Sequence, residues 1–429
     1  MNKLLNKLPI KGEFAKNALI LTLGTSVAQA FPILFYPILG RIFSPTDFGL
    51  LATITSITAI LTIISTGKYE ASILIAKTNK EAVNIIGLVL LLSFSFLFLS
   101  FIFLEIFSDQ LSVLMNSPNL EKWLFVPAIS GFSIVIFNCY NEWCVRNKYF
   151  VNLSWNKIIN SSANTLSKLF FGLVKYLSGG LILGDILGRI ISACGCVYKT
   201  IKKDKDIFFQ ISFREMKLSA KRYINFPKIY LPGQLLNTVG GQIPILLIAI
   251  LFNSYEVGLF SMTMNVLSIP ISVISLAIND TFRQKANEEY IIKGQCRDIF
   301  LKMFKLLSVF SIIGVMILFF ILPKIFELVL GNQWIKAGEY SQILIFMIAF
   351  SFISNSLGSV LIIAEKLKIS LLWQIYYFAI SCGSILLGKY IFNNIESTLY
   401  FYSIGMITVY LLQIILNYIY SDKRVSFTI

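Results

Sequence analysis

Two apolar stretches, SWNKIINSSANTLSKLFFGLVKY (154–176) and GGLILGDILGRIISACGCVYK (179–199), decide how this chain folds. The short turn Leu177–Ser178 joins them. At 1.5 Å per residue, each stretch is long enough as a helix to cross a hydrocarbon core about 30 Å thick. Each also carries ionisable side chains, Lys168 in the first and Asp185 and Arg189 in the second. Charged residues inside a membrane span are rare and are typical of functional sites.

If the first span starts near Lys157 and the second ends near Lys199, Lys168 and Arg189 lie about ten residues, or about 15 Å, from the same membrane face, near the middle of the core. Asp185 and Arg189 are four residues apart and can pair across one helical turn, which is the purely structural interpretation. Lys168 has no obvious partner in its own stretch. Two polar faces at matching depth predict a water-filled cavity with excess positive charge. Their other members are Asn160, Asn164 and Lys175 on the first face, and Ser192, Cys196 and Lys199 on the second.

Composition places the whole chain in a membrane. Of its 429 residues, 56% are hydrophobic and only 14% are charged, against about 25% charged residues in soluble domains. We predict an all-α polytopic membrane protein with twelve transmembrane helices. The first six are 17–41, 47–67, 84–107, 122–143, 154–176 and 179–199; the second six are 225–252, 257–282, 303–323, 340–364, 370–392 and 397–420.

The formal net charge of +15 is explained by where the basic residues lie relative to these spans. Lys and Arg concentrate in alternate loops, which is the positive-inside pattern of membrane proteins and argues against nucleic-acid binding. The pattern predicts that both termini lie in the cytoplasm.

Residue usage excludes several kinds of chemistry. The chain has no histidine, which removes histidine-based acid–base catalysis and the commonest zinc ligand. None of the six cysteines falls in a predicted outer loop, so a disulfide framework is not expected. We interpret Cys194 and Cys196 as helix packing residues. No catalytic group and no metal site is predicted.

The longest polar stretch, the inner loop Thr200–Tyr223, divides the chain into two halves of six spans. We therefore predict a first lobe over 1–199, a cytoplasmic linker loop over 200–224 and a second lobe over 225–429. The basic residues of the linker are explained by topology, and contact with anionic lipid is the alternative.

The halves carry matching segments. Asp47-Phe48-Gly49-Leu50 resembles Glu256-Val257-Gly258-Leu259, each at the start of the second span of its half. A repeat with an even number of spans puts both halves in the same orientation, related by an axis along the membrane normal. Chance similarity between apolar segments is the alternative.

Several motifs together resemble a known family. They are Gly40-Arg41, Ser44-Pro45-Thr46-Asp47-Phe48-Gly49, Thr66-Gly67-Lys68-Tyr69-Glu70, Ser268-Ile269-Pro270-Ile271-Ser272 and the segment 331–338 with Trp334. In order and spacing they are similar to the polysaccharide-unit (Wzx-type) flippases of the multidrug/oligosaccharidyl-lipid/polysaccharide exporter superfamily. Lys68 stands where that family more often has arginine, a change that preserves the charge.

The resemblance implies a MATE-like fold with two six-helix lobes around a central cavity. It implies a transporter rather than an enzyme, moving undecaprenyl-pyrophosphate-linked oligosaccharide from the cytoplasmic to the periplasmic leaflet by alternating access. Its further partners would be membrane lipids and the polysaccharide polymerase and assembly proteins. The nature of the product, O-antigen, capsule or another polysaccharide, is left open.

The resemblance also implies that cationic residues of the first lobe attract the pyrophosphate. Lys168 and Arg189 fit that role, and Arg41 and Lys68 are weaker candidates. No cofactor is expected. The carboxylates Asp185, Glu70 and Asp280 are candidates for charge pairing or for coupling to a gradient of H⁺ or Na⁺, and the sequence does not choose between these roles.

Two rival functions compete with the flippase. A cation-coupled multidrug exporter of the same superfamily would favour an acidic cavity, whereas this one is predicted to be cationic. A membrane glycosyltransferase or polymerase acting on the same lipid carrier would need catalytic carboxylates or a sizeable outer loop. The predicted outer loops are short and their carboxylates are scattered.

Overall fold

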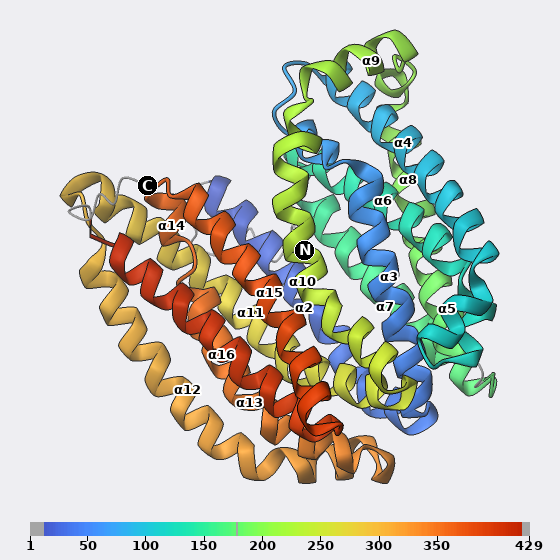
Figure 1. Cartoon of the computed structure of the whole chain (residues 1–429). Helices are drawn as coiled ribbons and strands as arrows, with labels where there is room; N and C mark the ends of the chain where they lie inside the picture. Colours follow the sequence, from blue (N-terminus) through green and yellow to red (C-terminus); the bar gives the residue numbers. More distant parts are fainter. Residues whose placement is uncertain (1–12, 177–178, 423–429) are drawn as a thin grey trace. The chain divides into compact units, whose positions relative to one another are not determined.

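Helices are the only regular secondary structure in the computed structural model, which describes the backbone of residues 13–176 and 179–422 and the side chains from Ile20 onward within those ranges (Figure 1). Both chain ends and the predicted turn Leu177–Ser178 lie outside the described residues. The long helices of the first half are α2 (Glu13–Ile42), α3 (Pro45–Thr66), α4 (Asn79–Ile106), α6 (Val126–Arg146), α7 (Phe150–Leu173) and α8 (Gly180–Phe208). Those of the second half are α10 (Leu231–Leu251), α11 (Ser254–Lys293), α12 (Arg297–Ile325), α13 (Ile335–Ser356), α15 (Leu367–Phe392) and α16 (Ile395–Tyr420).

Shorter elements connect the long helices. The short α-helices are α5 (Ser108–Leu114), α9 (Phe213–Arg222) and α14 (Val360–Ile363). The structure also has short segments of 3₁₀ or π helix: η1 (Tyr69–Ile73), η2 (Pro118–Trp123), η3 (Phe226–Tyr230), η4 (Phe326–Leu330) and η5 (Asn332–Trp334). Each of the twelve predicted spans corresponds to one long helix, so the prediction of an all-α polytopic fold is confirmed.

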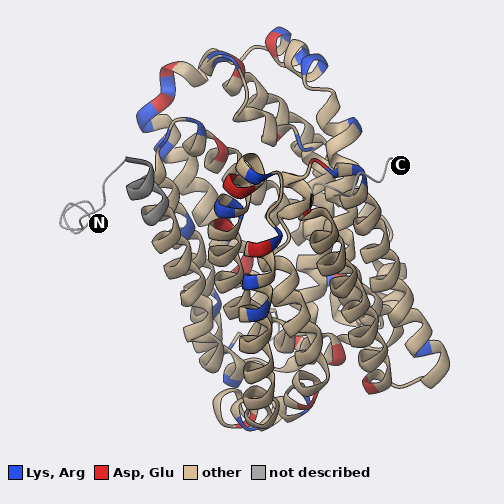
Figure 2. Ribbon diagram, turned by 90° about the vertical axis from the view of Figure 1, so that its left-hand side faces the viewer, with Lys and Arg blue, Asp and Glu red and all other residues tan. Residues whose placement is uncertain are grey.

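Ten candidate membrane spans are found among the described residues by length and apolar composition. They do not include α6 and α7. Helix α7 is less apolar because it carries Lys157 and Lys168 together with a series of asparagines. Figure 2 shows many charged residues at the upper ends of the long helices, and others along the helices in the middle of the view and at their lower ends.

The segment predicted as a linker loop, 200–224, is mostly helical. Helix α8 continues to Phe208, and its buried residue Asp204 accepts a hydrogen bond of 2.9 Å from the indole of Trp143. Helix α9 follows, capped by Ser212, whose hydroxyl accepts from the backbone N–H of Glu215. In Figure 1, α9 lies across the end of α4. The helices of this segment were not predicted because the contacts that hold it, such as the one from Trp143 to Asp204, join residues far apart in the sequence. The prediction that it links two lobes on the cytoplasmic side stays a prediction.

The described chain forms two compact units. The first runs to Phe43 and also takes in Ile57–Ser112 and Pro118–Leu235; the second comprises Ser44–Ser56, Val113–Ser117 and the chain from Leu236 onward. These units are defined by contacts alone, and the predicted lobe boundaries at 199 and 225 stay a prediction.

Within the second unit, the two matching segments of the sequence lie against each other. A Cβ atom on Gly49 would stand 1.7 Å from the carbonyl oxygen of Ser254, and a Cβ atom on Gly258 would stand 1.7 Å from that of Pro45. Pro45 precedes Gly49 by four residues, as Ser254 precedes Gly258. A contact in which each segment uses the same positions is what two-fold-related surfaces make. This reciprocal crossing supports the predicted duplication.

Candidate functional site

The hairpin of α7 and α8 is held together by glycines. A Cβ atom on Gly184 would lie 2.5 Å from the Cα of Lys168, and one on Gly188 would lie 2.3 Å from the Cα of Asn164. No larger residue fits without moving the helices apart. Small residues four apart allow such close approach of helices in membranes. The close approach sets the register in which side chains of the two helices meet.

At this crossing, three polar side chains converge on one buried carboxylate. Asp185 is 4% exposed. Its Oδ1 lies 3.0 Å from Lys168 Nζ and its Oδ2 lies 2.5 Å from Arg189 Nε. The amide of Asn164 donates a hydrogen bond of 2.9 Å to Oδ1. We call Asn164, Lys168, Asp185 and Arg189 the Asp185 cluster.

The cluster corrects one expectation and supports another. Lys168 is not unpaired: its partner is on the next helix, at a position that the separate helical faces could not reveal. The predicted pairing of Asp185 with Arg189 across one turn is observed. Two cations share one carboxylate, so the cluster keeps one net positive charge. The Arg189 side chain remains 24% exposed, which leaves part of its guanidinium open to a further partner.

The cluster lies in the half of each helix that is nearer the hairpin turn. Lys168 is five residues from the end of α7 and Asp185 five residues from the start of α8, about 7 Å along each helix. Both helices continue beyond Lys157 and Lys199, to Phe150 and Phe208. The predicted depth of Lys168 and Arg189 in the membrane stays a prediction.

The remaining predicted residues form a separate ion pair or stand on other helices. Lys68, which has a left-handed backbone (φ 58°), lies 3.2 Å from buried Glu70 at the start of η1. Arg41 is exposed in the last turn of α2. Asp280 is exposed on α11, in the second unit. Within the described ranges, no group of three or more Cys, Asp or Glu residues is arranged to hold a metal ion.

Residues 38–339 of the chain match the model of the family described as polysaccharide biosynthesis protein. The chain belongs to this family. The resemblance in the sequence is thereby confirmed. No curated protein sequence matches the chain.

Solved structures share the fold of this polysaccharide biosynthesis protein. One is an inward-facing multidrug resistance MATE family transporter of the MOP superfamily, with a TM-score of 0.71 at 14% identity over 92% of this chain and 97% of that chain. Another is the lipid II flippase MurJ in an inward closed conformation, with a TM-score of 0.71 at 11% identity over 93% of this chain and 86% of that chain. The outward-facing form of a MATE family transporter gives 0.62 at 15% identity, over 96% and 95%. The predicted MATE-like fold is confirmed, and the chain is a multi-pass membrane protein.

Two further cations of the same hairpin, Lys157 and Lys199, were not among the predicted site residues, although Lys199 was placed on the polar face of the second stretch. Lys157 Nζ donates 3.0 Å to the hydroxyl of Thr25 on α2, and Lys199 Nζ donates 2.5 Å to Oδ1 of Asn156. The spacing could have revealed one of them, because Lys157 and Lys168 are eleven residues apart and share a helical face.

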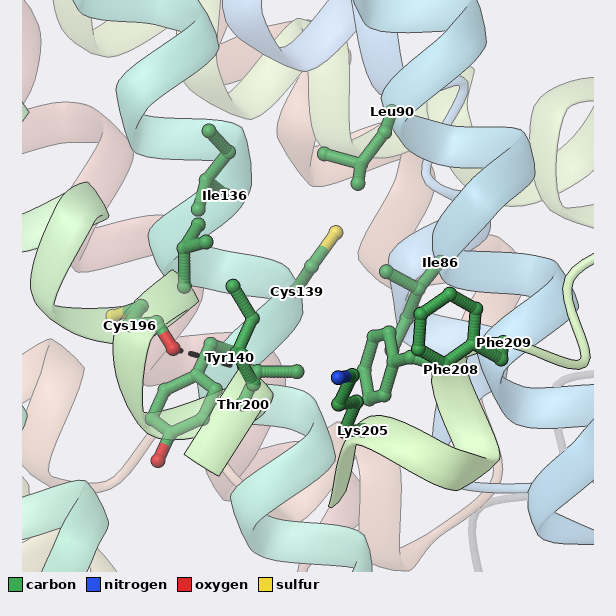
Figure 3. A pocket seen from close by; sticks show the side chains of 12 residues that line it. Ile86, Leu90, Ile136, Cys139, Tyr140, Cys196, Thr200, Lys205, Phe208 and Phe209 are labelled. Carbon is green, nitrogen blue, oxygen red and sulfur yellow. Dashed lines mark hydrogen bonds between the residues drawn. The ribbon is translucent and has the colours of Figure 1, made fainter. Parts of the chain in front are cut away.

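The first unit also holds an apolar pocket of about 380 Å³ between α4, α6 and α8 (Figure 3). Cys139, Cys196 and Phe208 are among its lining residues, and the Thr200 hydroxyl in its wall already donates to the carbonyl of Cys196. Lys205 is the one charged residue among those lining it. Such a wall suits hydrocarbon, whereas the Asp185 cluster suits an anion.

Proposed function

We propose that this protein is a lipid-linked oligosaccharide flippase. It moves undecaprenyl-pyrophosphate-linked repeat units from the cytoplasmic to the periplasmic leaflet of the bacterial inner membrane by alternating access. The observation that carries the proposal is the Asp185 cluster, a buried group with one positive charge in excess. Membership of a polysaccharide biosynthesis family supports the class of substrate.

The chemistry of the cluster favours a pyrophosphate group. Arg presents several N–H donors in a planar fork that matches phosphate oxygens, and Lys adds a point charge. Arg189 Nε donates a hydrogen bond of 2.5 Å to Oδ2 of Asp185. The second hydrogen bond, from Nη2 to Oδ1, is longer, at 3.4 Å. A phosphate that draws Arg189 away from Asp185 leaves the carboxylate with Lys168. Asp185 then competes with the substrate and favours its release.

The second unit, taken by itself, also holds an apolar pocket. It has a volume of about 620 Å³ and lies between α11, α12 and α13, with Pro270, Phe310 and Phe352 in its wall. Its volume is within the range of about 300–1,000 Å³ usual for ligand pockets. Among its lining residues Ser311 is the only one with a polar side chain. Such a wall suits hydrocarbon, as does the wall of the apolar pocket in the first unit.

The test is Arg189→Glu in a strain whose own copy has been deleted. The substitution changes the cluster from one net positive to one net negative charge, so we expect loss of surface polymer while complete lipid-linked units accumulate. Arg189→Lys, which keeps the charge but loses the fork, should retain part of the transport. Lys285→Glu on the exposed face of α11 is the matched charge-reversal control and should transport normally.

Other outcomes identify the rivals. Wild-type polymer with Arg189→Glu present in the membrane would overturn the role of the cluster. Missing or truncated lipid-linked units in the deletion strain would indicate a glycosyltransferase or polymerase. Unchanged polymer with altered drug tolerance would indicate a multidrug exporter.

A further inference from the structure

A second group of cations lies on the α7–α8 hairpin, about three helical turns from the Asp185 cluster. It consists of Lys157 with its partner Thr25, and Lys199 with its partner Asn156. We call these four residues the Lys157 cluster. Lys199 contacts the residue next to Lys157, so the two lysines belong to the same region of the hairpin.

The Lys157 cluster has no counter-charge. Among the described residues, no carboxylate lies within 4.0 Å of either lysine nitrogen, and the partners of both lysines are neutral. Both lysines are only partly exposed. In the Asp185 cluster a buried carboxylate compensates the charge of the partly buried cations. In the Lys157 cluster, as the structure describes it, no carboxylate compensates the two positive charges. An unpaired charge in a low-dielectric setting is costly, and an incoming anion removes that cost.

The cluster is also short of hydrogen-bond acceptors. Asn156 is 3% exposed, and its amide nitrogen has no hydrogen-bond partner among the described residues. Its oxygen is already used by Lys199. A buried donor without an acceptor costs about 1–3 kcal/mol. A ligand with several anionic oxygens would supply both the missing charge and the missing acceptors.

The position of the cluster relates it to the first. Lys157 and Lys168 are eleven residues apart, which is about 16 Å along α7 and nearly the same face. Ser161 and Asn164 lie between them on that face, and both are polar; the Ser161 hydroxyl donates to the carbonyl of Ala28. The two clusters stand on either side of the middle of α7 (Phe150–Leu173). The two cationic groups therefore lie on nearly the same face of α7, one in each half of the helix, with the polar residues Ser161 and Asn164 between them.

We propose that Lys157 and Lys199 form a second anion site, which holds the pyrophosphate of the lipid-linked substrate before it moves to Lys168 and Arg189. The proposal rests on the proposed function and adds a step to it. The Lys157 cluster is the group nearer the predicted cytoplasmic end of the hairpin, so it meets the substrate first. The Asp185 cluster, whose carboxylate opposes tight binding, is the group from which the substrate leaves.

The first experiment uses the wild-type protein in nanodiscs of zwitterionic lipid, so that no variant has to fold. An amine-reactive acetylating reagent labels lysines, and mass spectrometry measures the rate at each one with and without undecaprenyl pyrophosphate. We expect the lipid to slow labelling of Lys157 and Lys199 about fivefold or more, while exposed Lys285 on α11 is labelled at an unchanged rate. Unchanged labelling of Lys157 and Lys199 would overturn the second site.

The same measurement separates two sources of phosphate. Phosphatidylglycerol in place of undecaprenyl pyrophosphate should protect the two lysines much less, because it offers one phosphate with a single negative charge. Equal protection by both lipids would mean a general phospholipid contact and would overturn the proposal.

A binding experiment distinguishes failure of this site from failure of the proposed function. Affinity for undecaprenyl pyrophosphate is measured for the wild type, for Lys157→Gln with Lys199→Gln, and for Arg189→Gln. We expect the double variant to bind about tenfold more weakly and Lys157→Arg with Lys199→Arg to bind nearly as well as the wild type. Full affinity in the Gln double variant would overturn the second site alone. No binding by the wild type would overturn the proposed function itself.

Discussion

Two buried carboxylates, one in each unit, are paired with lysine at almost the same distance, and yet the groups around them differ in net charge. In the first unit, Asp185 lies 3.0 Å from Lys168 and also holds Arg189. In the second, Glu256 lies 2.9 Å from Lys336, and its other oxygen accepts a hydrogen bond of 2.5 Å from the hydroxyl of Tyr340. We call Glu256, Lys336 and Tyr340 the Glu256 cluster. One cluster has a surplus positive charge, and the other is balanced.

Their positions in the helices explain the difference. Glu256 is in the first turn of α11, where Asn253 caps the helix and a carboxylate also interacts favourably with the helix dipole. The Glu256 cluster therefore ties α11 to α13 and needs no further ligand. Asp185 lies beyond the first turn of α8, and its carboxylate is shared by two cations, Lys168 and Arg189. An uncompensated buried charge indicates a functional site, whereas a balanced ion pair alone does not.

The largest expected difference between the clusters follows removal of the carboxylate charge. Asp185→Asn leaves two neighbouring cations without a counter-ion and should cost about 3–5 kcal/mol of folding stability. Glu256→Gln leaves one lysine, which is 34% exposed and can turn to solvent, and should cost about 1 kcal/mol or less. Unfolding of the two variants in mixed detergent measures both effects. Equal losses would break the comparison, since they would show that the surplus charge of the first unit carries no special cost.

A smaller effect is expected from the helix contact that builds the Asp185 cluster. Gly188→Ala places a methyl group against the Cα of Asn164, and overpacking of this kind costs about 1–3 kcal/mol. By separating the helices it should also weaken the pairing of Lys168 with Asp185 and reduce transport. The matched control is Gly195→Ala on the same helix, where a Cβ atom would meet nothing within 4 Å. Transport lost equally in both variants would mean that flexibility of α8, and not its contact with α7, is what the glycines provide.

The smallest effect is expected in the balanced cluster. Lys336→Met removes the partner of Glu256 but leaves the hydrogen bond from Tyr340, so the stability loss should be about 1 kcal/mol or less and surface polymer should be unchanged. The measurement is polymer staining together with thermal unfolding in detergent. Loss of polymer with normal stability would contradict a purely structural role of the Glu256 cluster and would show that the second unit takes part in substrate transport.

Sequence reasoning succeeded where the determining property is local. The twelve helices are predicted by runs of apolar residues and by the turn residues that separate these runs. The charged residues Lys168, Asp185 and Arg189 were recognisable because each interrupts such a run. The pair Asp185–Arg189 was predictable because four residues make one helical turn. The matching segments at Gly49 and Gly258 were found from sequence alone, and the structure adds that they touch.

It failed where two distant segments decide the outcome. Helix α8 continues past Lys199 with a kink at Asp204, and the carboxylate of Asp204 is bound by Trp143, which is 61 residues away. The partner of Lys168 depends on how α7 and α8 are aligned, and that alignment depends on glycines whose role becomes visible only when the helices are packed. Lys157 was read as a span boundary because a lysine near the end of an apolar run is usually interfacial.

The sequence by itself determined that this is a helical membrane protein, because hydrophobic length and the scarcity of charge are properties of each segment alone. It also determined which charges are candidates for function. Only the tertiary structure decided how those charges are compensated: Lys168 and Arg189 share one carboxylate, while Lys157 and Lys199 have none in the described part of the chain. The reason is that electrostatic pairing acts over about 3–4 Å, and such distances between helices are set by packing contacts that no single segment contains.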